Sequence, residues 1–260
     1  MKKYLFRLLI SLFILLNIKN FANCETFVST SPSMTEIMYA LGADDKLKAV
    51  SSECSYPIDA KNKPIIGNTY YINMEMLLKI KPDYFLAPDS AEFMLNKIKK
   101  FDIEPLCFKY KNIEDIYKNI KTLGKLTSKK DEADELISFI QNKIKNSNKN
   151  LNKKILYIIQ EEPIIVPAKN SFLNDVIKKS GNKLITDDIN SYYPIVSVEY
   201  LINKKPDIIV LDYYCKDTKK LEKFFPNTKI IKMTKQESEI INRPSNRIWM
   251  GVEYFSNLPF

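Results

Sequence analysis

The 260-residue sequence predicts an α/β protein of two similar lobes, each with a central, mostly parallel sheet, joined by a long backbone helix. One stretch of the chain recurs 124 residues later with the same pattern. About 235 residues remain once a leader is removed, more than the roughly 100–150 residues of a usual single-core domain. Two stretches of helical periodicity separate the copies. We therefore expect an N-terminal lobe over residues 25–126, a helical linker over 127–150 and a C-terminal lobe over 151–260.

The repeated stretch reads MEMLLKIKPDYFLAP from residue 74 and VEYLINKKPDIIVLD from residue 198. Two positions before each glutamate stands a small polar residue, Asn73 or Ser197, which predicts a helix N-cap. Each short helix should stop at Lys-Pro-Asp, because proline disfavours a helical residue before it and cannot continue the hydrogen-bond ladder. The apolar runs 84–87 and 208–211 predict central parallel strands. Each copy is therefore a helix, turn and strand unit in its own lobe.

The segment before the first copy predicts a strand, a helix and a second strand. Residues 26–30 (TFVST) form the first strand, and Ser33 with Glu36 makes a capping box that opens a helix closed by Gly42. Residues 47–50 form the next strand.

Between the copies, residues 112–125 and 128–145 carry apolar side chains at helical spacing. The second stretch would cover ~27 Å at about 1.5 Å per residue, enough to cross from one lobe to the other. A strand at 154–159 then begins the second lobe.

The first 24 residues have the pattern of a signal peptide. Lys2, Lys3 and Arg7 precede an apolar run, Leu8 to Leu16, that is shorter than the ~20 residues needed to span a bilayer. Small residues before position 25 predict a mature chain that starts at Glu25. The alternative is a lipoprotein anchored through Cys24. In both cases we expect a protein outside the cytoplasm, periplasmic or at the outer face of the cytoplasmic membrane.

Composition excludes several functions. Removing the leader lowers the formal charge from +9 to +5, and the lysines are scattered, so we expect no nucleic-acid partner. The chain has no histidine, which removes the commonest general base and the imidazole ligands of most zinc, manganese and haem sites. It also has no glycine-rich phosphate loop, so a nucleotide site is not expected. We therefore expect no catalytic residue, no metal and no cofactor. Cys54, Cys107 and Cys215 form an odd set, and a Cys54–Cys107 disulfide is one open pairing.

Five motifs in order resemble the cobalamin-binding solute receptors of bacterial ABC importers: FVSTSPSMTEIMYALGA, AVSSECSYPIDA, INMEMLLKIKPDYFLAP, VSVEYLINKKPDIIV and NRPSNRIWMGVEYF. Their superfamily also contains receptors for ferric siderophores and haem. The resemblance implies that a ligand is held in a cleft between the lobes. It also implies that Glu75 and Glu199, one on each lobe, dock on arginines of the two permease subunits, whereas ordinary first-turn acids are the structural alternative.

A corrin ring is a large, partly apolar disc edged with amides, so its site should offer aromatic faces and a few polar groups. The resemblance points to seven ligand-binding candidates: Tyr56, Tyr70, Tyr71, Tyr192, Tyr193, Glu239 and Arg243. For Glu239 and Arg243, the alternative to ligand binding is an ion pair with each other at the surface. Matching family positions often carry tryptophan, but this chain has only Trp249, which we expect in the core. Without histidine, the protein would bind cobalamin with its own base or water as the lower ligand.

The leading hypothesis is a monomeric receptor that captures a corrinoid as cargo and delivers it to an ABC permease dimer, with membrane contact only through the permease or a lipid anchor. A ferric siderophore or haem receptor of the same fold is the alternative. A secreted carboxylate-dependent hydrolase would instead need two carboxylates converging in the cleft. An adhesive surface protein would need no pocket between the lobes.

Overall fold

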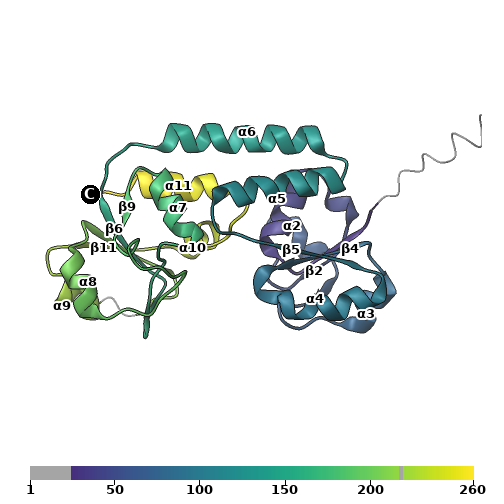
Figure 1. The fold of residues 1–260 in the computed structure, drawn as a ribbon, viewed down its shortest axis with the longest axis horizontal. Helices are drawn as coiled ribbons and strands as arrows, with labels where there is room; N and C mark the ends of the chain where they lie inside the picture. The colour runs from purple at the N-terminus through teal and green to yellow at the C-terminus, as the bar shows by residue number, and fades with distance from the viewer. Residues whose placement is uncertain (1–24, 217–218) are drawn as a thin grey trace, which may run out of the picture.

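The computed structural model describes residues 25–216 and 219–260 and contains one parallel sheet in each half of the chain. Figure 1 shows the two sheets side by side, with helix α6 lying across both. The predicted leader, residues 1–24, falls outside the described residues. The predicted α/β class with parallel central sheets is confirmed.

The first sheet has the order β3-β2-β1-β4-β5 and is parallel throughout. Alternate residues of its strands face opposite layers: Phe27 packs in the cluster with helix α2, and Val28 packs in the cluster with α3 and α4. The elements of this half are β1 (Phe27–Ser29), α2 (Pro32–Ala40), β2 (Leu47–Ser51), β3 (Ile65–Gly67), α3 (Met74–Ile80), β4 (Tyr84–Pro88), α4 (Glu92–Ile98) and β5 (Glu104–Phe108). Short 3₁₀ turns cover Asp44–Lys46, Ile58–Asn62, Asp89–Ala91 and Lys99–Phe101.

The second sheet has the order β11-β10-β6-β9, also parallel, and a small antiparallel hairpin, β7-β8, extends from it. Its central strand β10 is completely buried, as predicted from its apolar run. The elements are β6 (Lys154–Ile158), β7 (Gln160–Glu161), β8 (Ile164–Ile165), α7 (Phe172–Lys179), β9 (Lys183–Leu184), α8 (Val198–Lys204), β10 (Ile208–Leu211), α9 (Lys219–Phe224), β11 (Lys229–Lys232), α10 (Lys235–Ile241) and α11 (Ile248–Ser256).

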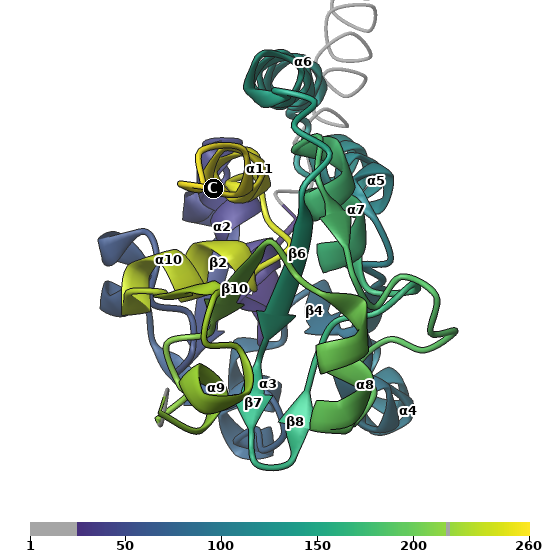
Figure 2. The same ribbon diagram turned by 90° about the vertical axis from the view of Figure 1, so that its left-hand side faces the viewer.

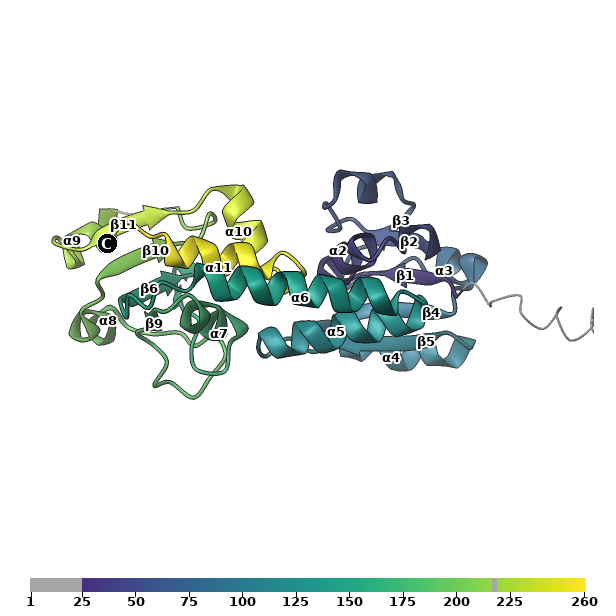
Figure 3. The ribbon, with the colours of Figure 1, turned by 90° about the horizontal axis from the view of Figure 1, so that it is seen from above.

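Helix α6 (Lys130–Ser147) links the halves and packs against α5 (Ile113–Leu126) and α11. Seen from above, α6 runs along both of these helices (Figure 3). Gly124 permits the close approach of α5 to α6, because a Cβ there would lie 2.5 Å from the Cβ of Ala133. Trp249 packs edge-to-face on Phe139 of α6; it is half-buried against the core instead of lying within it as expected. Among the described residues, no helix is both long and apolar enough to cross a membrane.

The repeated unit has the predicted local structure in both halves. Asn73 Oδ1 accepts from the backbone N–H of Met76 at 3.0 Å, and Ser197 Oγ accepts from that of Tyr200 at 3.2 Å. Each helix ends at a left-handed lysine, with φ of 46° at Lys81 and 49° at Lys205. The following proline then leads the chain into a central strand.

The repeated aspartate also has one role in both lobes. Asp83 Oδ2 accepts from the backbone N–H of Thr26 at 2.7 Å, and Asp207 Oδ2 accepts from that of Lys154 at 2.7 Å. Thr26 directly precedes β1, and Lys154 opens β6, the strands paired with β4 and β10. Each aspartate therefore fixes the start of one central strand beside its neighbour.

One sequence prediction is wrong, and one pairing that the sequence left open is not formed. The N-cap of α2 is Ser31, not Ser33, with Pro32 as the first helical residue, and Glu36 turns into the protein instead of closing a capping box. The Cys54–Cys107 disulfide is not formed. Cys54 has a free thiol, buried 3.2 Å from Thr35 Oγ1, and burial raises its pKa.

Candidate functional site

Loops that follow the carboxyl ends of three strands in the N-terminal half face the C-terminal half. Ser55, after β2, lies 3.1 Å from the guanidinium of Arg243. Asp89, after β4, is close enough for its charge to act on Tyr193. Asn112, after β5, lines a cavity together with residues of α7. Because ligands of open α/β sheets bind beyond the carboxyl ends of the strands, this junction is the candidate site.

A buried carboxylate fastens the junction. Glu36, on α2 of the N-terminal half, has a side chain with 0% exposure and accepts from Arg247 Nη2 at 2.6 Å and from Arg247 Nε at 2.8 Å. Arg243 Nη1 lies 3.2 Å away and Ser245 Oγ donates at 2.6 Å. Two arginines from one segment of the C-terminal half thus balance the charge of a carboxylate of the other half, and Ser245 adds a hydrogen bond.

The same arginines hold the loop that carries Tyr56. The guanidinium carbon of Arg247 lies 3.8 Å from the centroid of the Tyr56 ring, a cation–π contact. Arg243 Nη2 donates to Ser55 Oγ and to the Glu53 carbonyl. Tyr56 remains 45% exposed, so its position is fixed while part of the ring stays open to the junction.

Arg243 and Glu239 do not form the surface ion pair that the sequence analysis offered as an alternative to ligand binding. Arg243 pairs with Glu36, so the surface ion pair with Glu239 is wrong. Glu239 lies on α10, half-buried, four residues before Arg243. No sequence pattern identifies Glu36 as the partner of Arg243, because the two residues are 207 positions apart.

Tyr70 and Tyr71 lie on a tight turn after β3. Asn68 Oδ1 accepts from both of their backbone N–H groups, at 2.9 and 2.8 Å. Thr69 Oγ1 reaches the carbonyl of Thr30, at the end of β1, at 3.4 Å. The rings are 55% and 79% exposed, so a short, well-fixed turn presents both to solvent.

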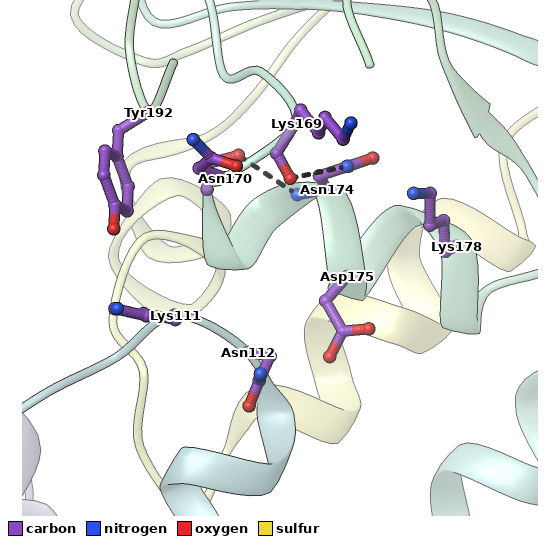
Figure 4. Close-up of a pocket in the computed structure, with 9 residues that line it drawn as sticks. Lys111, Asn112, Lys169, Asn170, Asn174, Asp175, Lys178 and Tyr192 are labelled. Carbon is purple, nitrogen blue, oxygen red and sulfur yellow. Dashed lines mark hydrogen bonds between the residues drawn. The ribbon is translucent and has the colours of Figure 1, made fainter. Parts of the chain in front are cut away.

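Tyr192 and Tyr193 diverge into two cavities. Tyr192 lines a cavity of about 490 Å³ with residues of α7 and the start of α5 (Figure 4). Tyr193 lines a second cavity of about 480 Å³ on the wall of the C-terminal half. Its pKa is raised to about 12, first by burial among surrounding protein and then by the charge of Asp89. Its ring is nevertheless 42% exposed. A side chain that is surrounded by protein and yet open to solvent is expected to face a cleft.

The second cavity contains residues that the sequence interpretation missed. Asp212 and Tyr214 line it directly after β10, with Phe172 and Leu173 from the start of α7. Asp212 is 2% exposed, and Tyr157, Ser238 and Asn242 all donate to its Oδ2 at 2.6–2.9 Å. The sequence pattern that could have identified them is the Asp-Tyr-Tyr run directly after a predicted central strand. Residues at this position lie at the carboxyl edge of a parallel sheet, where ligands bind.

Glu75 and Glu199 lie away from the junction. Both are exposed in the first turns of α3 and α8. Figure 1 places these helices at opposite ends of the molecule, and Figure 2 places both on the side opposite α6. The pKa of Glu199 is lowered by its own backbone N–H and by Ser197, so the carboxylate stays charged. The two carboxylates do not converge as a hydrolytic pair would.

The described residues hold no group of three or more His, Cys, Asp or Glu side chains placed to bind a metal ion. The arrangement at the junction offers aromatic faces, hydrogen-bonding groups and fixed arginines. It can bind a large, partly apolar solute.

Comparison with known proteins gives consistent matches. A family model described as "Periplasmic binding protein" matches residues 27–235. The Vitamin B12-binding protein of Vibrio vulnificus (strain YJ016) is 28% identical over 247 residues, covering 89% of each chain. An uncharacterized ABC transporter substrate-binding lipoprotein of Bacillus subtilis (strain 168) is 28% identical over 199 residues, covering 72% of this chain and 63% of its own.

Two solved structures share the fold. The crystal structure of the periplasmic vitamin B12 binding protein BtuF of Vibrio cholerae matches with a TM-score of 0.76 and 25% identity, covering 89% of this chain and 95% of that one. The periplasmic heme binding protein HutB of Vibrio cholerae matches with a TM-score of 0.76 at 17% identity, covering 90% and 98%. The second likeness shows the fold alone.

Proposed function

The chain belongs to the periplasmic binding protein family, and on this premise we propose that it captures a corrinoid outside the cytoplasm and delivers it to an ABC permease. Its relatives are solute-binding proteins, not enzymes, and any bound solute is cargo instead of a cofactor. Proteins of this family act outside the cytoplasm with an ABC transporter.

The observation that carries the proposal is that both halves present half-exposed tyrosines at one junction. Tyr56 comes from residues 25–126 and Tyr193 from residues 151–260, the two units that we propose as lobes. An aromatic ring can stack on the flat face of a corrin, and two lobes can cover both of its faces. We further propose that Tyr70, Tyr71 and Tyr192 contact the ligand edge, and that Glu239 and Arg243 supply polar contacts.

The test is a calorimetric titration of the mature protein with cyanocobalamin. We expect one-to-one binding, a rise in melting temperature and weaker binding by Tyr56→Ala and Tyr193→Ala. Phe101→Ala is the control, because this ring is 40% exposed and precedes the amino end of β5, at the sheet edge opposite the junction. Equal losses in all three variants would contradict the assignment of the cleft.

A haem or ferric siderophore receptor is the second candidate, because a heme binding protein shares this fold and the fold therefore does not select the ligand. Haem and a ferric siderophore are titrated in parallel. Binding of either, with no response to cyanocobalamin, would retain the transport role and replace the ligand. Binding of none would contradict the proposed function.

We propose Glu75 and Glu199 as the contacts to the permease. Their exposure at opposite ends of one side suits a permease of two similar subunits. Glu75→Ala with Glu199→Ala should leave ligand binding unchanged and abolish stimulation of the transporter ATPase in vesicles. Loss of ligand binding, or full stimulation, would contradict docking through these carboxylates.

We propose that the mature chain is soluble, monomeric and starts at Glu25. Anchoring at Cys24 is the alternative, and the Bacillus subtilis relative is named a lipoprotein. Intact mass and membrane fractionation distinguish them, because a lipidated Cys24 adds a diacylglyceryl group and moves the protein to the membrane pellet.

A further inference from the structure

The cavity beside Tyr192 differs in chemistry from the aromatic junction. It measures about 490 Å³ and lies between the start of α5 and the first turns of α7. Figure 4 shows lysine, asparagine and aspartate side chains around it, with Tyr192 at one side. Asp175 of α7 accepts from the backbone N–H of Ile113 at 2.9 Å, which joins the two halves here.

The cavity carries unbalanced positive charge. Lys111, Lys169 and Lys178 line it, and none of them forms an ion pair with any residue that the structure describes. Asp175 is the one carboxylate among its lining residues, and one of its oxygens is occupied by the Ile113 amide. Three ammonium groups around one such carboxylate favour an anionic guest.

Asn174 adds a second, neutral feature. It lines the cavity at 2% exposure, and its Nδ2 donates to the Lys169 carbonyl at 3.0 Å, which fixes the orientation of the amide. Its Oδ1 is buried without a hydrogen-bond partner among the described residues. A buried oxygen without a hydrogen-bond donor is unfavourable, and a ligand hydroxyl group could supply that donor to Asn174.

Residues adjacent in sequence line this cavity and the one that contains Tyr193. The neighbours Tyr192 and Tyr193 line one cavity each, and so do the consecutive residues Leu173 and Asn174 of α7. Each cavity is too small for a whole corrinoid, so a ligand of that size would extend from one into the next.

We propose that the lysine-lined cavity binds an oxyanion on a peripheral arm of the ligand. A phosphodiester beside a sugar hydroxyl, as in the nucleotide arm of cobalamin, matches both the ammonium groups and the acceptor of Asn174. Propionate carboxylates at the edge of haem carry the same anionic chemistry. This inference rests on the proposed receptor function and assigns the part of the ligand read by Lys111, Lys169 and Lys178.

The test compares ligands with and without the oxyanion. Cobinamide lacks the nucleotide arm, and haem dimethyl ester lacks free carboxylates. The triple variant Lys111→Gln, Lys169→Gln, Lys178→Gln should bind cyanocobalamin roughly tenfold more weakly and cobinamide within about twofold of the unmodified protein. Lys97→Gln, Lys99→Gln, Lys100→Gln removes the same charge from lysines that are equally exposed but do not line the cavity, and should change neither affinity. Circular dichroism and melting temperature verify folding.

The outcomes separate this inference from the proposed function. A selective loss for cyanocobalamin supports the subsite, and equal changes for cyanocobalamin and cobinamide overturn it while the corrinoid receptor stands. Where the protein binds haem instead, preference for haem over its dimethyl ester, abolished in the triple variant, supports the subsite with propionate as the guest. Absence of that preference overturns it. Binding of no corrinoid and no haem overturns both proposals.

Discussion

The two copies of the repeated unit agree in structure until the central strand ends, and then they differ. Both begin with a polar N-cap, end their helix at a left-handed lysine and anchor an aspartate to the neighbouring strand. At the strand end, Pro88 stands in the N-terminal copy where Asp212 stands in the C-terminal copy. Asp212 lines a cavity beside Tyr193 and Tyr214. The repeat therefore preserves the scaffold, while the strand ends carry the differences that shape a site.

The halves also neutralise their buried carboxylates differently. Glu36 of the N-terminal half depends on Arg243 and Arg247 of the other half. Asp212 depends on hydroxyl and amide donors of its own half, including Tyr157. Burial, and then the charge of Asp212, hold the pKa of Tyr157 well above its ordinary value, so this phenol remains a donor. Glu36 therefore joins the two halves, whereas Asp212 holds together residues of the C-terminal half alone.

Among the variants that test this comparison, Glu36→Gln should cause the largest loss of stability. It leaves Arg243 and Arg247 partly buried without a carboxylate, which should lower the free energy of unfolding by about 3–5 kcal/mol. Urea denaturation measures this change. Glu132→Gln is the control, since Glu132 pairs with Lys129 at the surface of α6 and its loss should leave the midpoint unchanged. Equal midpoints for both variants would show that the junction does not depend on Glu36.

Asp212→Asn should come next. Asp212 now accepts hydrogen bonds through both oxygens, and the new amide would place an N–H group against one of these donors. The free energy of unfolding should fall by about 2–3 kcal/mol. Pro88→Ala, at the equivalent position of the other copy, should change stability by less than about 1 kcal/mol. Thermal unfolding of both variants checks the difference. A loss for Pro88→Ala as large as that for Asp212→Asn would contradict the predicted difference between the two strand ends.

Asp83→Ala should cost about 1 kcal/mol, because it removes a hydrogen bond to the start of β1. The backbone N–H of Thr26 lowers the pKa of Asp83 below its ordinary value. A carboxylate with a lowered folded-state pKa stabilises the protein above its unfolded pKa, about 3.9, and loses that effect as pH falls through the folded value.

The stability difference between the unmodified protein and Asp83→Ala should therefore be constant near neutral pH and shrink below about pH 4. Urea midpoints between pH 3 and 7 test it. Asp207→Ala is the matched variant and should lose less, because Asp83 also accepts from Thr26 Oγ1 at 2.8 Å. A difference that grows on acidification would have the wrong sign for this mechanism.

Lys81→Gly and Lys205→Gly should have the smallest effects. Both lysines have positive φ, which costs a non-glycine residue about 1 kcal/mol, while glycine makes the unfolded chain more flexible. The two terms nearly cancel, so each change should be within about 1 kcal/mol and equal in sign. Opposite signs in differential scanning calorimetry would show that the two turns are not equivalent.

Features that depend on neighbours along the chain could be predicted from the amino-acid sequence. The caps at Asn73 and Ser197, the helix ends at Lys-Pro-Asp and the buried strands at 84–87 and 208–211 all follow from local propensity and periodicity. Even here, Ser33 was chosen as the cap of α2 when Pro32 made Ser31 the better one. The two-lobed α/β class followed because the repeat doubled these local signals.

Contacts between residues far apart in the chain could not be predicted in this way. Glu36 and Arg243 lie 207 positions apart, and no local pattern relates them. The separation of Tyr192 and Tyr193 into different cavities, and the gathering of Lys111 with Lys169 and Lys178, likewise depend on how the halves sit against each other. The physical reason is that burial and charge pairing are set by all neighbours in space, whereas a sequence displays only neighbours along the chain.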